Sequence, residues 1–427
     1  MNQLNNSNFH SPLKKYKHRQ ACAVVRFLQP DGAPLAGQDL IISQTNHQFL
    51  FGCNGFYLVP LVNGRLDGQQ KEIAEQRREK FMKLFNFVTL PFYWARFEPQ
   101  AGHSETQQVM NAAQWLASRG ILLKGHPLCW HTLAPNWLLS MDNEEILAAQ
   151  LRRIQREVSD FRGVIDIWDV INETVIMPIF DKYDNGITRI CKQLGRIQTI
   201  RAVFEAARTA NPEAVLLIND FDISPAFDIL VEGCLEAGIR IDVIGIQSHM
   251  HQGYWGVEKT LRILEHFERF KLPIHFTETT IISGKLMPPE IVDLNDYEVA
   301  EWPSTPEGEE RQAQEVLLHY QTLFDHPLVA GVTWWDFADG QWLKAPGGLT
   351  RSDASSKPAY EELLKLVKGE WWLGPTLFTT DQEGKIQFNG FLGDYEVTYA
   401  EKKASFSLAR KTAQVFTGRP MEITIQF

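Results

Sequence analysis

Residues 164–173, VIDIWDVINE, hold the pattern that decides the fold. An apolar run ends abruptly in two polar residues, Asn172 and Glu173. Near-continuous apolar runs of this length are typical of strands buried on both faces, as in parallel sheets. The stretch before it carries apolar residues at helical spacing, and either Asp142 or Asn143 is placed to cap its start. A helix followed by a buried strand is the repeating unit of an α/β protein.

The same unit recurs along the chain. Seven further apolar runs span 49–56, 86–92, 122–130, 214–222, 243–250, 273–279 and 329–339. Helical stripes occur at 69–85, 193–210, 257–270 and 309–325, and a last helix is expected at about 357–368. Eight parallel strands that alternate with helices are the count of a closed (β/α)8 TIM barrel. A doubly wound open sheet is the alternative, but the chain lacks the G-x-G-x-x-G opening found in many such folds.

The two chain ends have a different sequence pattern from the rest of the chain. Residues 21–48 and 371–427 read as short strands broken by glycine and proline turns. The C-terminal strands alone are too few for a comfortable sandwich. We therefore expect both ends to form one small accessory β-sandwich-like unit beside a catalytic barrel at 49–368. Residues 1–20 are predicted to be a polar, loosely ordered tail.

The composition of the chain disfavours several classes of partner and indicates where the protein is located in the cell. The 427 residues include 42 basic and 52 acidic side chains, a net charge of −10, which disfavours a nucleic-acid partner. No apolar run is long enough for a membrane span, so no membrane partner is expected. The N-terminus has no apolar signal region, which predicts a cytoplasmic protein, with secretion as the alternative if a leader has been removed. Five scattered cysteines without a C-x-x-C disfavour a disulfide framework and a zinc knuckle. The oligomeric state stays open.

Two glutamates lie where a barrel carries its chemistry. Glu173 and Glu278 each follow an apolar run, and active sites of (β/α)8 barrels lie at the C-terminal ends of the strands. Glycoside hydrolysis needs two carboxyls, one to protonate the leaving oxygen and one to attack or to activate water. Each glutamate alone is equally typical of a loop residue or an ion-pair partner. His249 and His251 form an H-x-H that is a weaker alternative, a metal site at the rim.

Several motifs together resemble the family-10 glycoside hydrolases, chiefly endo-β-1,4-xylanases, over residues 49–365. Gly125–His131 resembles the family's G-H-x-L-x-W-H, and Trp168–Glu173 resembles W-D-V-x-N-E. Further matches, in the family's order, are Ile218–Asp220, Gly245–His249, Thr277–Glu278, Gly331–Trp335 and Lys357–Tyr360. The resemblance implies a retaining hydrolase with a β-linked oligo- or polysaccharide as its partner and with no metal or cofactor.

The resemblance also implies a role for each matched position. Glu173 would be the general acid/base and Glu278 the nucleophile, with carboxyls about 5–5.5 Å apart in a retaining pair. The pKa of Glu173 would be raised by nearby like charge. The implied substrate-binding residues are Asn172 at the sugar 2-hydroxyl, Gln247 near the acid/base, His249 beside Glu278, His126 at the sugar, and Trp335 and Trp342 as platform and lid.

The chain departs from the family at three places. The family's T-x-E-N-x-M-K-W, whose Glu, Asn and Lys grip the glycone sugar, reads TLPFYW at 89–94. Leu90, Pro91 and Phe92 cannot replace those side chains, whereas Tyr93 offers one hydroxyl and Trp94 one N–H. The family's T-E-L-D reads TETT at 277–280, and its W-G reads Trp335-Asp336. We therefore expect weak activity on plain xylan and a preference for short, substituted or different β-glycans. A carbohydrate-binding barrel with little or no activity and a metal-dependent barrel hydrolase are the alternatives.

Overall fold

A computed structural model describes residues 15–410 and 420–427 of the chain. Its centre is a closed barrel of eight parallel strands in the order β10-β3-β4-β5-β6-β7-β8-β9. The strands are β3 (Leu50–Asn54), β4 (Phe87–Pro91), β5 (Leu122–His126), β6 (Ile167–Asn172), β7 (Val215–Asp220), β8 (Val243–Met250), β9 (Ile274–Ile281) and β10 (Val329–Trp334). Each strand lies within one of the predicted apolar runs or overlaps it closely. The predicted (β/α)8 TIM barrel is therefore confirmed.

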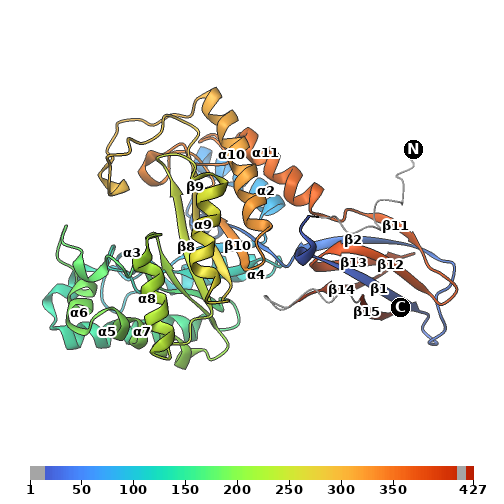
Figure 1. The fold of residues 1–427 in the computed structure, drawn as a ribbon, viewed down its shortest axis with the longest axis horizontal. Helices are drawn as coiled ribbons and strands as arrows, with labels where there is room; N and C mark the ends of the chain where they lie inside the picture. Colours follow the sequence, from blue (N-terminus) through green and yellow to red (C-terminus); the bar gives the residue numbers. More distant parts are fainter. Residues whose placement is uncertain (1–14, 411–419) are drawn as a thin grey trace.

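Helices connect the barrel strands (Figure 1). They are α1 (Leu58–Val62), α2 (Gly68–Leu84), α3 (Trp94–Phe97), α4 (Thr106–Ala117), α5 (Asn143–Asp160), α6 (Gly186–Leu194), α7 (Arg196–Ala210), α8 (Pro225–Glu236), α9 (Gly256–Glu268), α10 (Pro306–Phe324) and α11 (Pro358–Lys365). Of the two predicted capping candidates, Asp142 caps α5 and forms a capping box with Glu145. The sequence analysis did not list α1, α3, α4, α6 or α8. Within the described ranges, no helix is long and apolar enough to cross a bilayer.

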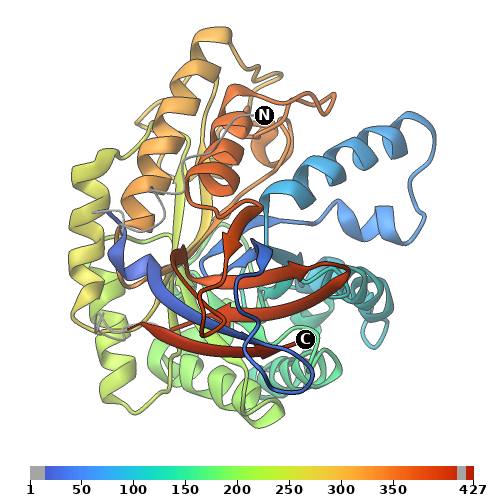
Figure 2. The same cartoon turned by 90° about the vertical axis from the view of Figure 1, so that its right-hand side faces the viewer.

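The accessory unit consists of two sheets that each combine strands from both chain ends. One has the order β12-β1-β15, and the other β11-β2-β13-β14. The strands are β1 (Gln20–Leu28), β2 (Asp39–His47), β11 (Thr376–Thr379), β12 (Lys385–Phe391), β13 (Gly393–Tyr399), β14 (Lys402–Leu408) and β15 (Met421–Gln426). Figure 2 faces this unit, with the blue β1 among the red C-terminal strands. The sheets share an apolar core that includes Phe27, Ile42 and Phe388, so the predicted unit from the two chain ends is confirmed.

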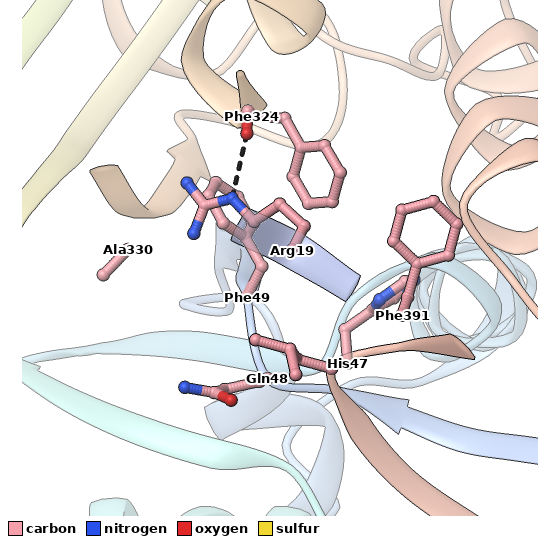
Figure 3. A pocket seen from close by; sticks show the side chains of 8 residues that line it. Arg19, His47, Gln48, Phe49, Phe324, Ala330 and Phe391 are labelled. Carbon is pink, nitrogen blue, oxygen red and sulfur yellow. Dashed lines mark hydrogen bonds between the residues drawn. The ribbon is translucent and has the colours of Figure 1, made fainter. Parts of the chain in front are cut away.

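The N-terminal segment ties this unit to the barrel. Of the predicted polar tail, residues 1–14 lie outside the described residues, and the remainder is packed rather than loose. Tyr16 is buried against Phe324. The Arg19 guanidinium donates to the carbonyl of Phe324 at 2.9 Å (Figure 3). It also donates to the carbonyl of Val329 at 2.5 Å. These carbonyls lie where α10 ends and β10 begins. The accessory unit therefore covers the N-terminal end of the barrel, opposite the mouth that carries the site (Figure 1).

Candidate active site

Glu173 lies directly after β6 in a backbone conformation that side chains rarely adopt. Its φ is 58°, and its N–H donates to the carbonyl of Asn219 on the next strand at 2.8 Å. A non-glycine residue held in this region costs about 1–3 kcal/mol and indicates a functional position. Its carboxyl accepts from Trp130 Nε1 at 2.8 Å, from Asn172 Nδ2 at 3.3 Å and from Gln247 Nε2 at 3.4 Å. The strained backbone thus holds the acid among three donors.

Glu278 lies within β9 and is only 4% exposed. His249 Nε2 lies 3.2 Å from its Oε2, as predicted for this pair. Asn219 Nδ2 donates to its Oε1 at 2.8 Å, and His126 Nε2 lies 3.9 Å from the same oxygen. The carboxyl is therefore surrounded by nitrogen atoms from β5, β7 and β8.

A chain of amides links the two carboxyls. Asn219 Nδ2 lies 2.8 Å from both Asn172 Oδ1 and Glu278 Oε1. Gln247 Nε2 donates to Asn172 Oδ1 at 3.0 Å, and Thr277 donates to Asn219 Oδ1 at 2.6 Å. The sequence analysis quoted Asn219 within a family motif but did not assign it to the site. Its signal was the polar residue that closes the apolar run of β7.

The two carboxyls have opposite protonation tendencies. Burial, with a further contribution from the charge of Glu278, raises the pKa of Glu173 to about 8. Burial also opposes ionisation of Glu278, but the charge of His126 and the hydrogen bond and charge of His249 outweigh it and hold the pKa of Glu278 below its usual value. The predicted direction for Glu173 is confirmed, although burial rather than like charge is the main cause. At neutral pH one carboxyl is an acid and its neighbour an anion.

His126 joins Glu278 to a charged group inside the barrel. Its Nδ1 lies 2.7 Å from Asp169 Oδ2, and Lys124 Nζ lies 2.7 Å from the same oxygen. All three side chains are almost fully buried. Burial opposes the charge on Asp169, but Lys124 and His126 outweigh it and keep the pKa of Asp169 below its usual value. His126 is therefore a buried histidine that is paired with Asp169 within the barrel and also lies beside Glu278 in the site.

Aromatic rings form one wall of the mouth. The ring of Trp335 lies 5.3 Å from that of His126 and 5.5 Å from that of Phe56. Tyr93 packs edge-on to Phe56 at 5.7 Å and to His126 at 5.5 Å, and it lies 5.6 Å from Trp130. The structure therefore places Trp335 and Tyr93 beside the carboxyl pair on the β3, β4, β5 and β10 side. Phe56, which was not predicted, completes this wall.

Trp94 does not reach the site. Its Nε1 donates to Glu98 Oε2 at 3.0 Å, and its ring packs against Trp137 and the guanidinium of Arg153. The chain turns into α3 immediately after Tyr93, and this turn buries Trp94 beneath the helices. The predicted sugar contact from Trp94 is contradicted, because its only N–H is already used within the fold.

Asp336 places a third carboxyl at the mouth. Its φ is 70°, and its N–H donates to Asn54 Oδ1 at 3.0 Å. Its two oxygens accept from Asn54 Nδ2 at 2.9 Å and from the backbone N–H of Trp342 at 2.8 Å. The ring of Trp342 in turn lies 4.6 Å from that of His249. Asp336 thus anchors the segment that carries the predicted lid.

The two histidines of the H-x-H pair pack against aromatic rings of the mouth. The rings of His249 and His251 lie 5.9 Å apart, and His251 packs between Trp302 and Trp342. Among the described residues, no group of three or more His, Cys, Asp or Glu side chains is placed to hold a metal ion. The chemistry that the described site offers is that of its two carboxyls. An acid and a carboxylate at the mouth of a (β/α)8 barrel are the arrangement of a glycoside hydrolase.

Comparison with known proteins agrees with this class. Residues 62–366 match the model of glycosyl hydrolase family 10. An endo-1,4-β-xylanase B of Thermotoga neapolitana is 26% identical over 278 residues, which are 62% of this chain and 74% of the relative. An endo-1,4-β-xylanase C of Paenibacillus barcinonensis is 28% identical over 358 residues, which are 73% of this chain and 31% of the relative.

A solved structure has the same fold. Native xylanase 10B from Thermotoga maritima matches with a TM-score of 0.60 at 22% identity, covering 76% of this chain and 96% of that one. Because the family match spans well over half of the residues, the chain belongs to glycosyl hydrolase family 10, a family of retaining glycoside hydrolases.

Proposed function

We propose that this protein hydrolyses β-1,4-linked xylan-type glycans by double displacement, with Glu278 as nucleophile and Glu173 as acid/base. The observation that carries the proposal is that Asn219 and Asn172 link two buried carboxyls, whose pKa values are shifted in opposite directions. Family membership and relatives named as endo-1,4-β-xylanases support the substrate class.

The proposal assigns a residue to each step. In the first step Glu278 attacks the anomeric carbon while the protonated Glu173 donates its proton to the leaving oxygen. The glycosyl ester that forms carries no charge on Glu278, which removes one cause of the raised pKa of Glu173. Glu173 then accepts a proton from water, and the resulting attack releases the sugar with its original β configuration.

We further propose that the glycone side selects a short, substituted or different β-glycan rather than plain xylan. The wall of Phe56, Tyr93 and Trp335 offers a surface on which a sugar ring can stack. The chain lacks the charged and amide side chains that the family carries after the strand that corresponds to β4. A lost hydrogen bond to a sugar hydroxyl costs about 0.5–3 kcal/mol.

The test is a substrate screen with catalytic variants. Wild type should cleave aryl β-xylosides or β-linked oligosaccharides with retention of configuration by NMR, and Glu278→Ala should lose this activity. With a reactive aryl substrate, azide should rescue Glu173→Ala and yield a β-glycosyl azide, because azide attacks the glycosyl ester from the face that water uses. An inverted first product would overturn double displacement, and binding without turnover would favour the inactive carbohydrate-binding barrel. Loss of activity with EDTA would favour the metal-dependent alternative.

A further inference from the structure

The segment between β9 and α10 is a built element at the barrel mouth. Residues 282–305 include a single 3-10 turn, Leu294–Asp296, and appear in Figure 1 as the gold loop beyond β9. The segment has its own small core, in which Ile282, Met287 and Trp302 are buried. Trp302 Nε1 also donates to a backbone carbonyl of the segment at 2.7 Å. Its position is therefore set by packing.

One side of this segment contacts the lid residue. Asn295 Oδ1 accepts from Trp342 Nε1 at 3.2 Å, and the ring of Trp342 lies 4.6 Å from His249, which binds Glu278. Lys344 Nζ adds a bond to the carbonyl of Ala300 at 3.3 Å. The 3-10 turn is thereby held to the β8 and β10 side of the mouth.

The other side of the segment is bound to the loop that follows the acid/base. Lys182 Nζ lies 2.6 Å from Asp293 Oδ2 and 2.5 Å from Asp296 Oδ1. Lys182 belongs to the segment between β6 and α6, which is anchored where Phe180 packs on His131 at 4.5 Å. In the barrel order β6 and β9 are separated by β7 and β8. The ion pairs therefore bridge two loops across this part of the mouth.

In the proposed function the glycone lies against the aromatic wall, which belongs to β3, β4, β5 and β10. With the substrate bound in that direction, the leaving group that Glu173 protonates lies over the remaining part of the mouth, where the bridge stands. We propose that Lys182, Asp293 and Asp296 form an ion-pair clasp that closes the mouth there, so that the enzyme favours substrates with a short leaving part over long polymer chains. The inference rests on the proposed glycosidase function and names what limits its substrate length.

The clasp is easily opened. Lys182 is 40% exposed, and Asp293 and Asp296 are 34% and 62% exposed, so water and salt screen the pairs. A long chain can enter only in the fraction of molecules in which the clasp is open. Losing the clasp should raise the ratio of kcat/KM on polymeric xylan to that on a short oligosaccharide by about two- to fivefold, the size expected from exposed ion pairs.

The experiment compares this ratio in wild type, Lys182→Ala and Asp293→Asn with Asp296→Asn. Both clasp variants should raise the ratio mainly through the polymer, and 1 M NaCl should raise it in wild type but not in Lys182→Ala. A charge exchange, Lys182→Glu with Asp293→Lys and Asp296→Lys, should restore the wild-type ratio. Lys403→Ala, which removes an exposed ion pair of Lys403 with Glu396 on the accessory unit, is the matched control and should leave the ratio unchanged.

The failures are distinguishable. An unchanged ratio in the clasp variants, with wild type active on the short oligosaccharide, would overturn the clasp and leave the proposed function intact. A rise in Lys403→Ala equal to that in Lys182→Ala would also overturn it, since the effect would then be one of general surface charge. A wild type inactive on every β-linked substrate would overturn both proposals.

Discussion

The indole N–H of Trp130 lies 2.8 Å from Oε2 of Glu173. Burial and the charge of Glu278 favour the protonated form of this glutamate, whereas a hydrogen bond donated to its carboxylate favours the ionised form. Trp130, from the segment after β5, therefore limits how far the pKa of Glu173 rises. Its N–H sets the balance between the acid that the first step needs and the base that the second step needs.

Replacing Trp130 with Phe should move the alkaline limb of the pH profile upward. The ring stays, but the N–H that stabilises the carboxylate is lost, so the pKa of Glu173 should rise above its value of about 8. A hydrogen bond to a charged group is worth about 1.5–3 kcal/mol, and a shift of one pKa unit corresponds to about 1.4 kcal/mol. We expect a shift of about one pH unit in kcat/KM on a substrate with a sugar leaving group. Trp137→Phe, which loses a bond to a backbone carbonyl instead, should leave the limb in place.

Replacing Thr280 with Asp should move the acid limb of kcat/KM to higher pH. His249 Nε2 lies 3.2 Å from Glu278, and its Nδ1 lies 3.3 Å from the Thr280 hydroxyl. The charge of His249 helps to hold the pKa of Glu278 below its usual value, and a carboxylate at position 280 would offset that charge and raise the pKa of Glu278. Thr280→Asn, of similar shape but uncharged, should keep the wild-type limb. An acid limb that moves downward in Thr280→Asp would contradict this account.

Replacing Glu173 with Gln should stabilise the fold above neutral pH. The pKa of Glu173 is raised from 4.5 to about 8, so between these values the folded state holds a proton that the unfolded state has lost. The contribution of this group to stability is therefore full below about pH 4.5 and falls as the pH rises toward 8. Gln does not ionise, so the variant should gain about 1–3 kcal/mol relative to wild type at pH 8 and little at pH 4. Denaturant unfolding at the two pH values measures this difference, and a gain equal at both would refute the assignment.

The barrel was predictable because its strands are buried on both faces. Such strands leave uninterrupted apolar runs, and the run at 243–250 coincides with β8. Glu173 and Glu278 were predictable for the same reason, since each interrupts or closes a run. The accessory unit could be predicted because neither chain end has enough strands to form a sandwich alone.

The sequence predictions fail or are incomplete where a residue's role depends on the direction of its side chain or on the path of a loop. Trp94 offers an N–H by residue type, but only the turn into α3 shows that Glu98 takes it. The segment that carries Asp293 and Asn295 has no periodic pattern, so its course across the mouth depends on contacts with Lys182 and Trp342, which are distant in sequence. Patterns of period 2 or 3.6 carry no information about such contacts.

Asp336 should affect substrate binding through Trp342. Its carboxylate accepts from the backbone N–H of Trp342 at 2.8 Å, which places that ring beside His249. Asp336→Gly removes the acceptor, and glycine tolerates the φ of 70° at this position, so backbone strain does not obscure the result. The variant also loses the bond from Asn54, but it is the lost bond to Trp342, about 1–2 kcal/mol, that predicts a KM about five- to thirtyfold higher on a short oligosaccharide with a smaller change in kcat. Trp342→Ala should give a similar loss, and the double variant should be little worse than either single one, because the two residues act through one contact. Losses that add in the double variant would mean that Asp336 touches the substrate independently of Trp342.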